Sequence, residues 1–169
     1  MKMTSAQAAK LLRQLNDELR NLTVREENSR SFLASLGEDP ESVRPAYDYA
    51  EMQKQQAELE HKIRKVKHAI NVFNATTVIP EFGFTIDEML VYLPQLTRCF
   101  NKLSVMADAL PKVRENAAFG RGNMIVDYRY ANYDIEQVNA DYRETSAELA
   151  RAQTALDLIN NTAEFDIEI

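Results

Sequence analysis

The residues best suited to chemistry are Glu58 and His61, whose spacing of three matches the glutamate and histidine that di-iron bundle proteins place on one helix. A complete site of that kind needs a second such pair and two more inward-facing glutamates. The only other histidine, His68, has Lys65 where the carboxylate would belong. Neither histidine falls on the apolar face of its helix, so we expect a solvated helix face and no metal site.

Cys99 is the single cysteine, which excludes an intramolecular disulfide and a zinc site built from several thiolates. It has no histidine near it in sequence and adjoins Phe100, which favours a buried or half-buried structural thiol over a nucleophile. The glycines of 120–122 lack the spacing and the helix cap of a phosphate-binding loop. No triad, paired-carboxylate cleft or dinucleotide motif occurs. The sequence therefore predicts a non-enzymatic protein with no catalytic residue and no cofactor.

Two stretches are candidates for interaction surfaces. Val126, Tyr128 and Tyr130 alternate along an expected strand, and together with Tyr133 they could form an assembly surface or stack on bases. The alternative is that these aromatic residues pack a small sheet onto helices. The basic run at 62–68 is the densest positive patch. On a heptad helix such a run is usually the solvated face, with contact to nucleic acid or a membrane as the lesser alternative.

The composition is typical of a helical soluble protein. The 169 residues are 45% apolar and 27% charged with 4 glycines and 5 prolines, which argues against disorder and against an all-β fold. The net charge of −6 disfavours a general nucleic-acid binder. Because no signal-like region follows Met1 and no run of about 18 apolar residues occurs, we expect a protein of the reducing cytoplasm without a membrane span.

Four segments carry apolar residues at alternating intervals of three and four, the heptad spacing of coiled coils, and each such row is called a seam below. The most regular seam runs over 49–73, within a helix expected at 44–75. An earlier seam runs over 8–36 and ends at Gly37, where a left-handed cap residue belongs. Two seams joined by so short a link predict an antiparallel helical hairpin over 4–75.

Polar side chains interrupt both seams of this hairpin. Glu26 and Ser29 break the first seam, and Gln56 breaks the second. If the chain turns at 37–44, Gln56 falls opposite the polar middle of the first helix, which predicts a polar layer that fixes the register of the hairpin. The alternative is a water-filled pocket in which these three side chains bind a ligand or take part in catalysis.

The second half of the chain holds a small β element. Segments 77–82 and 124–130 have strand-like sequences, and we expect them to pair because a lone strand leaves its backbone groups without hydrogen bonds. The tail at 165–169 also alternates, so it either adds a third strand or frays.

Two further seams lie in helices expected over 86–110 and 134–160. The first of these helices begins at a capping box made by Thr85 and Glu88. We therefore predict a mainly α fold in a single domain over 1–169. Its architecture would be an antiparallel coiled coil or bundle of four helices with a two- or three-stranded β element.

Short motifs are spread over about half of the chain: Ile70-Asn71, Asn74-Ala75-Thr76-Thr77, Gly83-Phe84-Thr85-Ile86 with Met89-Leu90, a strand before Asp134-Ile135, and Asp141-Tyr142-Arg143 with Leu149 and Gln153. They resemble those of a bacterial family of small helical proteins of unknown function, sometimes labelled septicolysin. The resemblance implies a mostly helical bundle with a small β element and brings no catalytic residues. The chain departs from the family in lacking a tryptophan in the last helix and an Arg-Asp pair in the third. The label implies membrane action, which no apolar stretch supports.

The seams lead to a hypothesis about function. Four long seams are hard to cover within one chain of this length, so we expect a non-enzymatic homo-oligomer that acts by binding protein, either its own copies or another protein. The first alternative is a holdase chaperone resembling prefoldin, with Val126 and Tyr128 in the assembling β region; the helix at 86–110 between the two β segments counts against it. The second is an enzyme or ligand binder that uses the polar layer.

Overall fold

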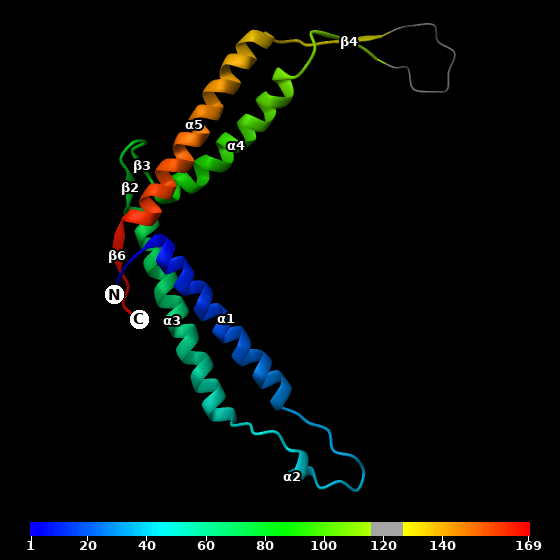
Figure 1. The fold of residues 1–169 in the computed structure, drawn as a ribbon, viewed down its shortest axis with the longest axis vertical. Coiled ribbons are helices and arrows are strands. Elements are labelled where there is room, and N and C mark those ends of the chain that lie inside the picture. Colours follow the sequence, from blue (N-terminus) through cyan, green and yellow to red (C-terminus); the bar gives the residue numbers. More distant parts are fainter. Residues whose placement is uncertain (116–126) are drawn as a thin grey trace, which may run out of the picture. The chain divides into compact units, whose positions relative to one another are not determined.

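A computed structural model of the chain describes residues 1–115 and 127–169 (Figure 1). The helices within these residues are α1 (Ser5–Ser29), α2 (Pro40–Val43), α3 (Tyr49–Thr76), α4 (Ile86–Ala107) and α5 (Ile135–Thr162). The strands are β1 (Lys2–Thr4), β2 (Val78–Ile79), β3 (Phe84–Thr85), β4 (Lys112–Arg114), β5 (Tyr128–Tyr130) and β6 (Glu164–Asp166). The prediction of a mainly helical fold is confirmed; in place of one β element of two or three strands, the described residues form three two-stranded antiparallel sheets.

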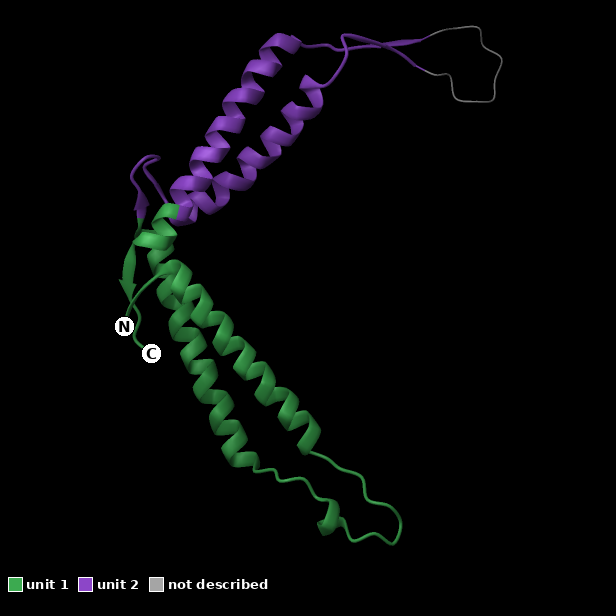
Figure 2. Cartoon of the chain, in the orientation of Figure 1, with its two compact units in different colours: residues 1–77, 158–169 green, residues 78–157 purple. Residues whose placement is uncertain are grey.

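The chain forms two compact units, which Figure 2 shows in different colours. The first unit contains residues 1–77 and 158–169, and the second contains residues 78–157. Each unit is built on a pair of long helices: α1 with α3, and α4 with most of α5. A four-helix bundle is not confirmed, and the single domain over 1–169 stays a prediction.

The first unit is a helical hairpin whose ends follow from local capping. Thr4 and Gln7 form a capping box at the start of α1, and the Asp48 side chain accepts from the Glu51 N–H at the start of α3. Ala8 and Leu15 of α1 are buried in one apolar cluster with Leu59 and Val66 of α3. Burying both seams against each other stabilises the pair, since neither helix has a second apolar face.

The first helix is shorter than predicted. It ends at Ser29 instead of Leu36, and α3 begins at Tyr49 instead of residue 44. Pro45 disfavours a helical conformation at the residue before it, and the backbone of Arg44 is extended, with φ −65° and ψ 120°. No helix is present at 44–48, so a longer α1 would have nothing to cover its seam. The chain leaves the helix instead, and Leu33 is 95% exposed.

In the first unit, the two ends of the chain pair with each other as a β ribbon. β6 pairs antiparallel with β1, so that Met3 stands opposite Phe165. Met1 and Ile167 exchange two backbone hydrogen bonds, at 2.9 Å and 2.8 Å. The alternation expected for the tail is present: the ring of Phe165 stacks on that of Phe73 with centroids 4.4 Å apart, and Ile167 is 1% exposed. The tail is thus a strand and part of the core.

The second unit is held by side chains that bridge α4 and α5. Thr85 and Glu88 form the expected capping box at the start of α4. The rings of Phe100 and Tyr142 stack with centroids 5.0 Å apart. The Tyr92 hydroxyl lies 2.5 Å from Glu148 Oε1. Large aromatic side chains thus fill the space between the two helices.

The predicted pairing of segments 77–82 and 124–130 is wrong. β2 pairs instead with β3, and β5 pairs with β4; residues 124–126 of the second segment lie outside the described residues. Both observed pairings join segments close in sequence, which costs less loop-closure entropy than a distant pairing. Gly83 makes the β2–β3 turn possible because its φ is +67°, a conformation that other residues rarely adopt.

Candidate functional site

The residues predicted to form a polar layer lie around Glu26, in the last turns of α1. Gln56 Nε2 of α3 donates to Glu26 Oε2 over 2.7 Å. The other carboxylate oxygen accepts from Gln53 Nε2 and from the Tyr47 hydroxyl, each over 2.9 Å. One carboxylate on α1 therefore holds two positions of α3 and the segment that leads into α3.

These hydrogen bonds change the ionisation of the groups that make them. The pKa of Glu26 is lowered, chiefly because Gln56 and then Tyr47 donate to the ionised carboxylate, with smaller contributions from Arg30 and Gln53. The pKa of Tyr47 is raised, first by partial burial and then by its hydrogen bond to Glu26. The carboxylate is thus held in its charged form and the phenol in its neutral form, as the hydrogen bond between them requires.

Ser29, the third residue of the predicted layer, lies beside this network in a different setting. It lines a hollow of about 250 Å³ together with Arg25, Tyr47, Asp48 and other residues of the α1–α3 end. The heptad spacing identified Glu26 and Gln56, but Tyr47 and Gln53 were missed. Gln53 could have been found because it lies three residues before Gln56 and so shares its face of the helix. Nothing in the spacing pointed to Tyr47, which lies outside the helices.

The arrangement around Glu26 is suited to holding a structure in place. Both carboxylate oxygens already accept from donors of the same chain, so an incoming ligand would have to displace them. A carboxylate with lowered pKa is also a poor general acid or base at neutral pH. The network therefore fixes the register of α1 against α3 and fastens the link at Tyr47.

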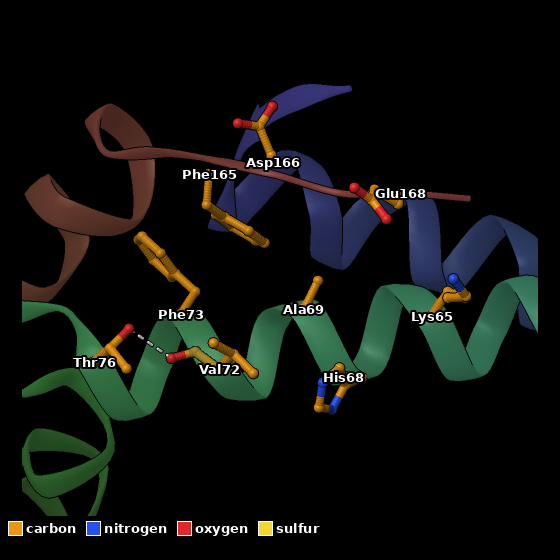
Figure 3. A pocket seen from close by; sticks show the side chains of 9 residues that line it. All are labelled: Lys65, His68, Ala69, Val72, Phe73, Thr76, Phe165, Asp166 and Glu168. Atoms are coloured by element: carbon orange, nitrogen blue, oxygen red, sulfur yellow. Dashed lines mark hydrogen bonds between the residues drawn. The ribbon is translucent and has the colours of Figure 1, made fainter.

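A second hollow, of about 410 Å³, lies between α3 and the tail strand (Figure 3). Its floor is apolar, made by the stacked Phe73 and Phe165 with Ala69 and Val72. Its rim carries Lys65, His68, Asp166 and Glu168. Val72 is 47% exposed, so apolar surface on this floor lacks a cover. The hollow is open, apolar at the bottom and charged at the edge.

Glu58 and His61, the pair with di-iron spacing, line a third hollow of about 500 Å³ with Lys54, Lys62 and Arg64. Both side chains are on the exposed face of α3. In the described part of the chain no group of three or more histidine, cysteine, aspartate or glutamate residues is placed to hold a metal ion. Cys99 is half-buried, as predicted.

The predicted assembly surface divides into two parts. Tyr128 and Tyr130 are exposed on β5, and the amine of Lys112 lies 4.0 Å from the Tyr128 ring centroid and 5.3 Å from that of Tyr130. Tyr133 is instead anchored, because its hydroxyl donates to the Met106 carbonyl over 3.0 Å. Val126 lies outside the described residues. The tyrosines of β5 do not pack a sheet onto helices, since every residue of β4 and β5 is exposed.

Comparisons with known proteins give the fold and no activity. No protein-family model matches the chain, and no curated protein matches it. A solved structure titled as a functionally unknown conserved protein from Corynebacterium diphtheriae is similar, with a TM-score of 0.60 at 17% sequence identity. The match covers 98% of this chain and 100% of the other. None of the helices in 1–115 and 127–169 is long and apolar enough to cross a membrane.

Proposed function

We propose that this protein is a non-enzymatic, self-associating helical protein that acts by binding protein. The observation that carries the proposal is the exposure of Leu33 and Leu36 in the loop between α1 and α2. Both residues are almost wholly in solvent, and Phe32 and Val43 near them are also exposed. A group of large apolar side chains at one place on a surface marks a site of contact with another protein.

The second unit supports the same proposal. Val105 and Leu110 near the end of α4 are exposed by 74% and 65%, and Tyr130 of β5 by 61%. Two-helix units leave much of each helix surface without a cover, and contacts between copies would complete the four seams as a coiled-coil bundle. The self-contained hydrogen bonding of Glu26 favours a structural role for the polar layer over a catalytic one.

The loop is tested by comparing tagged wild-type protein with Leu33→Ser/Leu36→Ser in a pull-down from the native host. We expect a protein partner to be retained by the wild type and lost from the variant. Val24→Ser/Val91→Ser, which changes two exposed apolar residues on the helices, is the matched control. Equal retention by the wild type and the loop variant would contradict the assignment of the loop.

A holdase chaperone is the second candidate, favoured by the position of Leu33 and Leu36 in the loop that joins two long helices. Exposed apolar residues at such a position can bind the apolar segments of unfolded chains. A denatured enzyme diluted into buffer would then aggregate less with the wild type present, and Leu33→Ser/Leu36→Ser would lose that protection. No protection by the wild type at an excess over the enzyme would remove this candidate.

A further inference from the structure

Two strands in different units have free edges with opposite charge. The sheet of β1 and β6 ends at β6, and the sheet of β4 and β5 ends at β4, within the described residues. Around β6 the sequence is Glu164-Phe165-Asp166, and β4 is Lys112-Val113-Arg114. Acidic residues flank an apolar one in the first strand, and basic residues flank an apolar one in the second.

The acidic residues of β6 are the ones whose backbone N–H and C=O groups point toward the free edge of the strand. Met1 and Ile167 exchange both backbone hydrogen bonds, so they form a hydrogen-bonded pair of the antiparallel ladder. Such pairs alternate along a ladder, which makes Met3 and Phe165 the next one. The N–H and C=O groups of Glu164 and Asp166 therefore point away from β1, toward the free edge.

The same reasoning applies to β4. Glu115 N–H donates to the Asp127 carbonyl over 2.9 Å, and Ala131 N–H donates to the Pro111 carbonyl over 3.1 Å. Hydrogen-bonded pairs thus fall at residues 111, 113 and 115. The backbone groups of Lys112 and Arg114 point away from β5, and both side chains are exposed. A free edge with unpaired backbone groups is a template for another strand.

We propose that β4 of one copy adds to the free edge of β6 in a second copy, as an antiparallel third strand. In this register Lys112 stands opposite Asp166 and Arg114 opposite Glu164, and their outward backbone groups form the hydrogen-bonded pairs. Val113 then stands opposite Phe165 on the other face of the sheet. Opposite charges at directly paired positions stabilise a ladder, and an apolar pair does so as well. This inference rests on the self-association proposed above.

The hollow beside β6 provides the space for the added strand. It lies between the tail and α3, and its exposed floor residue Val72 would be covered by the apolar face of the incoming strand (Figure 3). Asp166 points away from the floor in this view, on the side that the basic side chains would take. Lys2, opposite Asp166 on β1, offsets part of the acidic charge, but Glu164 and Glu168 leave the edge acidic. Lys65 and His68 lie on the α3 side of the hollow.

Pairing of like strands is disfavoured by the same charges. Two β6 edges in antiparallel contact would place acidic residues opposite acidic residues, and two β4 edges would place basic residues opposite basic ones. The complementary contact therefore joins different surfaces of the two copies. Such a contact joins two different surfaces: repeated head to tail it produces a ring or an extending chain, and made reciprocally between two copies it closes a two-fold dimer.

Charge reversal tests the contact with the full chain in sedimentation velocity at micromolar concentration. One variant carries Glu164→Lys/Asp166→Lys, and the other carries Lys112→Glu/Arg114→Glu. We expect each variant alone to sediment as a monomer, because its two edges then have the same charge. An equimolar mixture should assemble again, since each edge of one variant is complementary to an edge of the other. A chain with all four substitutions should assemble alone.

Neutral variants and circular dichroism separate folding from assembly. Glu164→Gln/Asp166→Asn should weaken assembly less than charge reversal does, with unchanged helical signal. If the wild type assembles and both reversed variants assemble equally well, this interface is wrong and the proposed self-association stands. If the two variants are monomeric alone and their mixture also stays monomeric, the pairing of β4 with β6 is wrong. A wild type that is monomeric throughout would overturn both proposals.

Discussion

Nε2 of Gln56 lies 2.7 Å from Oε2 of Glu26 across the α1–α3 hairpin. The contact joins the polar interruptions of two seams that are otherwise apolar. One register of the two helices brings these side chains together, and a shift by one turn would leave the Glu26 carboxylate against an apolar residue. This hydrogen bond therefore favours one register of α1 against α3, together with the apolar cluster that the two helices bury.

Replacing Glu26 with leucine should destabilise the first unit. The change removes the acceptor of Tyr47, Gln53 and Gln56 and leaves their polar groups facing an apolar side chain. We expect a lower urea midpoint, measured by circular dichroism at neutral pH. Glu27→Leu, at an exposed neighbouring position, is the control and should leave the midpoint nearly unchanged. Equal midpoints for Glu26→Leu and the wild type would show that the network does not hold the hairpin.

A fall in pH should lower the stability of the fold by protonating the Glu26 carboxylate. The pKa of Glu26 is lower in the folded chain than its ordinary value of 4.5. The Glu26 carboxylate therefore contributes fully to stability above pH 4.5. This contribution is lost as the pH falls below 4.5 and through the folded pKa. Glu88 acts in the same direction, because the Thr85 N–H and then its hydroxyl lower the Glu88 pKa. Glu26→Gln should show a smaller loss of urea midpoint on acidification than the wild type, while an identical loss would contradict this role.

The tail strand should contribute strongly to stability through Ile167. This side chain is 1% exposed and belongs to the apolar cluster of α1 and α3. Ile167→Ala should lower the free energy of unfolding by about 2–5 kcal/mol, because a buried isoleucine is replaced by a cavity. Ile169→Ala, at an exposed position two residues later, should change it by less than about 0.5 kcal/mol. Urea unfolding measures both, and equal effects would show that the tail is not part of the core.

Tyr92 and Glu148 should connect α4 with α5. Glu148 accepts from the Tyr92 hydroxyl and, together with partial burial, raises the pKa of Tyr92 above 10.0. Tyr92→Phe should cost about 1 kcal/mol in unfolding free energy near neutral pH. The wild type should lose this advantage as the pH rises through the folded pKa of Tyr92, since the ionised phenol no longer donates. A Tyr92→Phe protein as stable as the wild type at neutral pH would contradict the connection.

Sequence reasoning predicted what depends on regular spacing. The seams over 49–73 and 86–110 and the capping box of Thr85 and Glu88 correspond closely to α3 and α4. The alternation of the tail likewise corresponds to β6.

The features that spacing could not predict depend on which segments of the chain lie next to each other in the fold. In the sequence, the seam of the first helix continues to Leu36. The helix α1 ends at Ser29 because no second helix packs against residues 30–36. Strand-like segments at 77–82 and 124–130 do not reveal their partners, because many short segments can pair and the nearest one in sequence does so at the lowest entropic cost. Tyr47, which no periodic pattern includes, reaches Glu26 only because the link to α3 is extended.

Self-association is the central claim, and sedimentation equilibrium of the wild-type protein over a range of micromolar concentrations tests it most directly. We expect a weight-average mass above 19.3 kDa, the mass of one chain, that increases with concentration. A mass equal to that of one chain at every concentration would contradict the account.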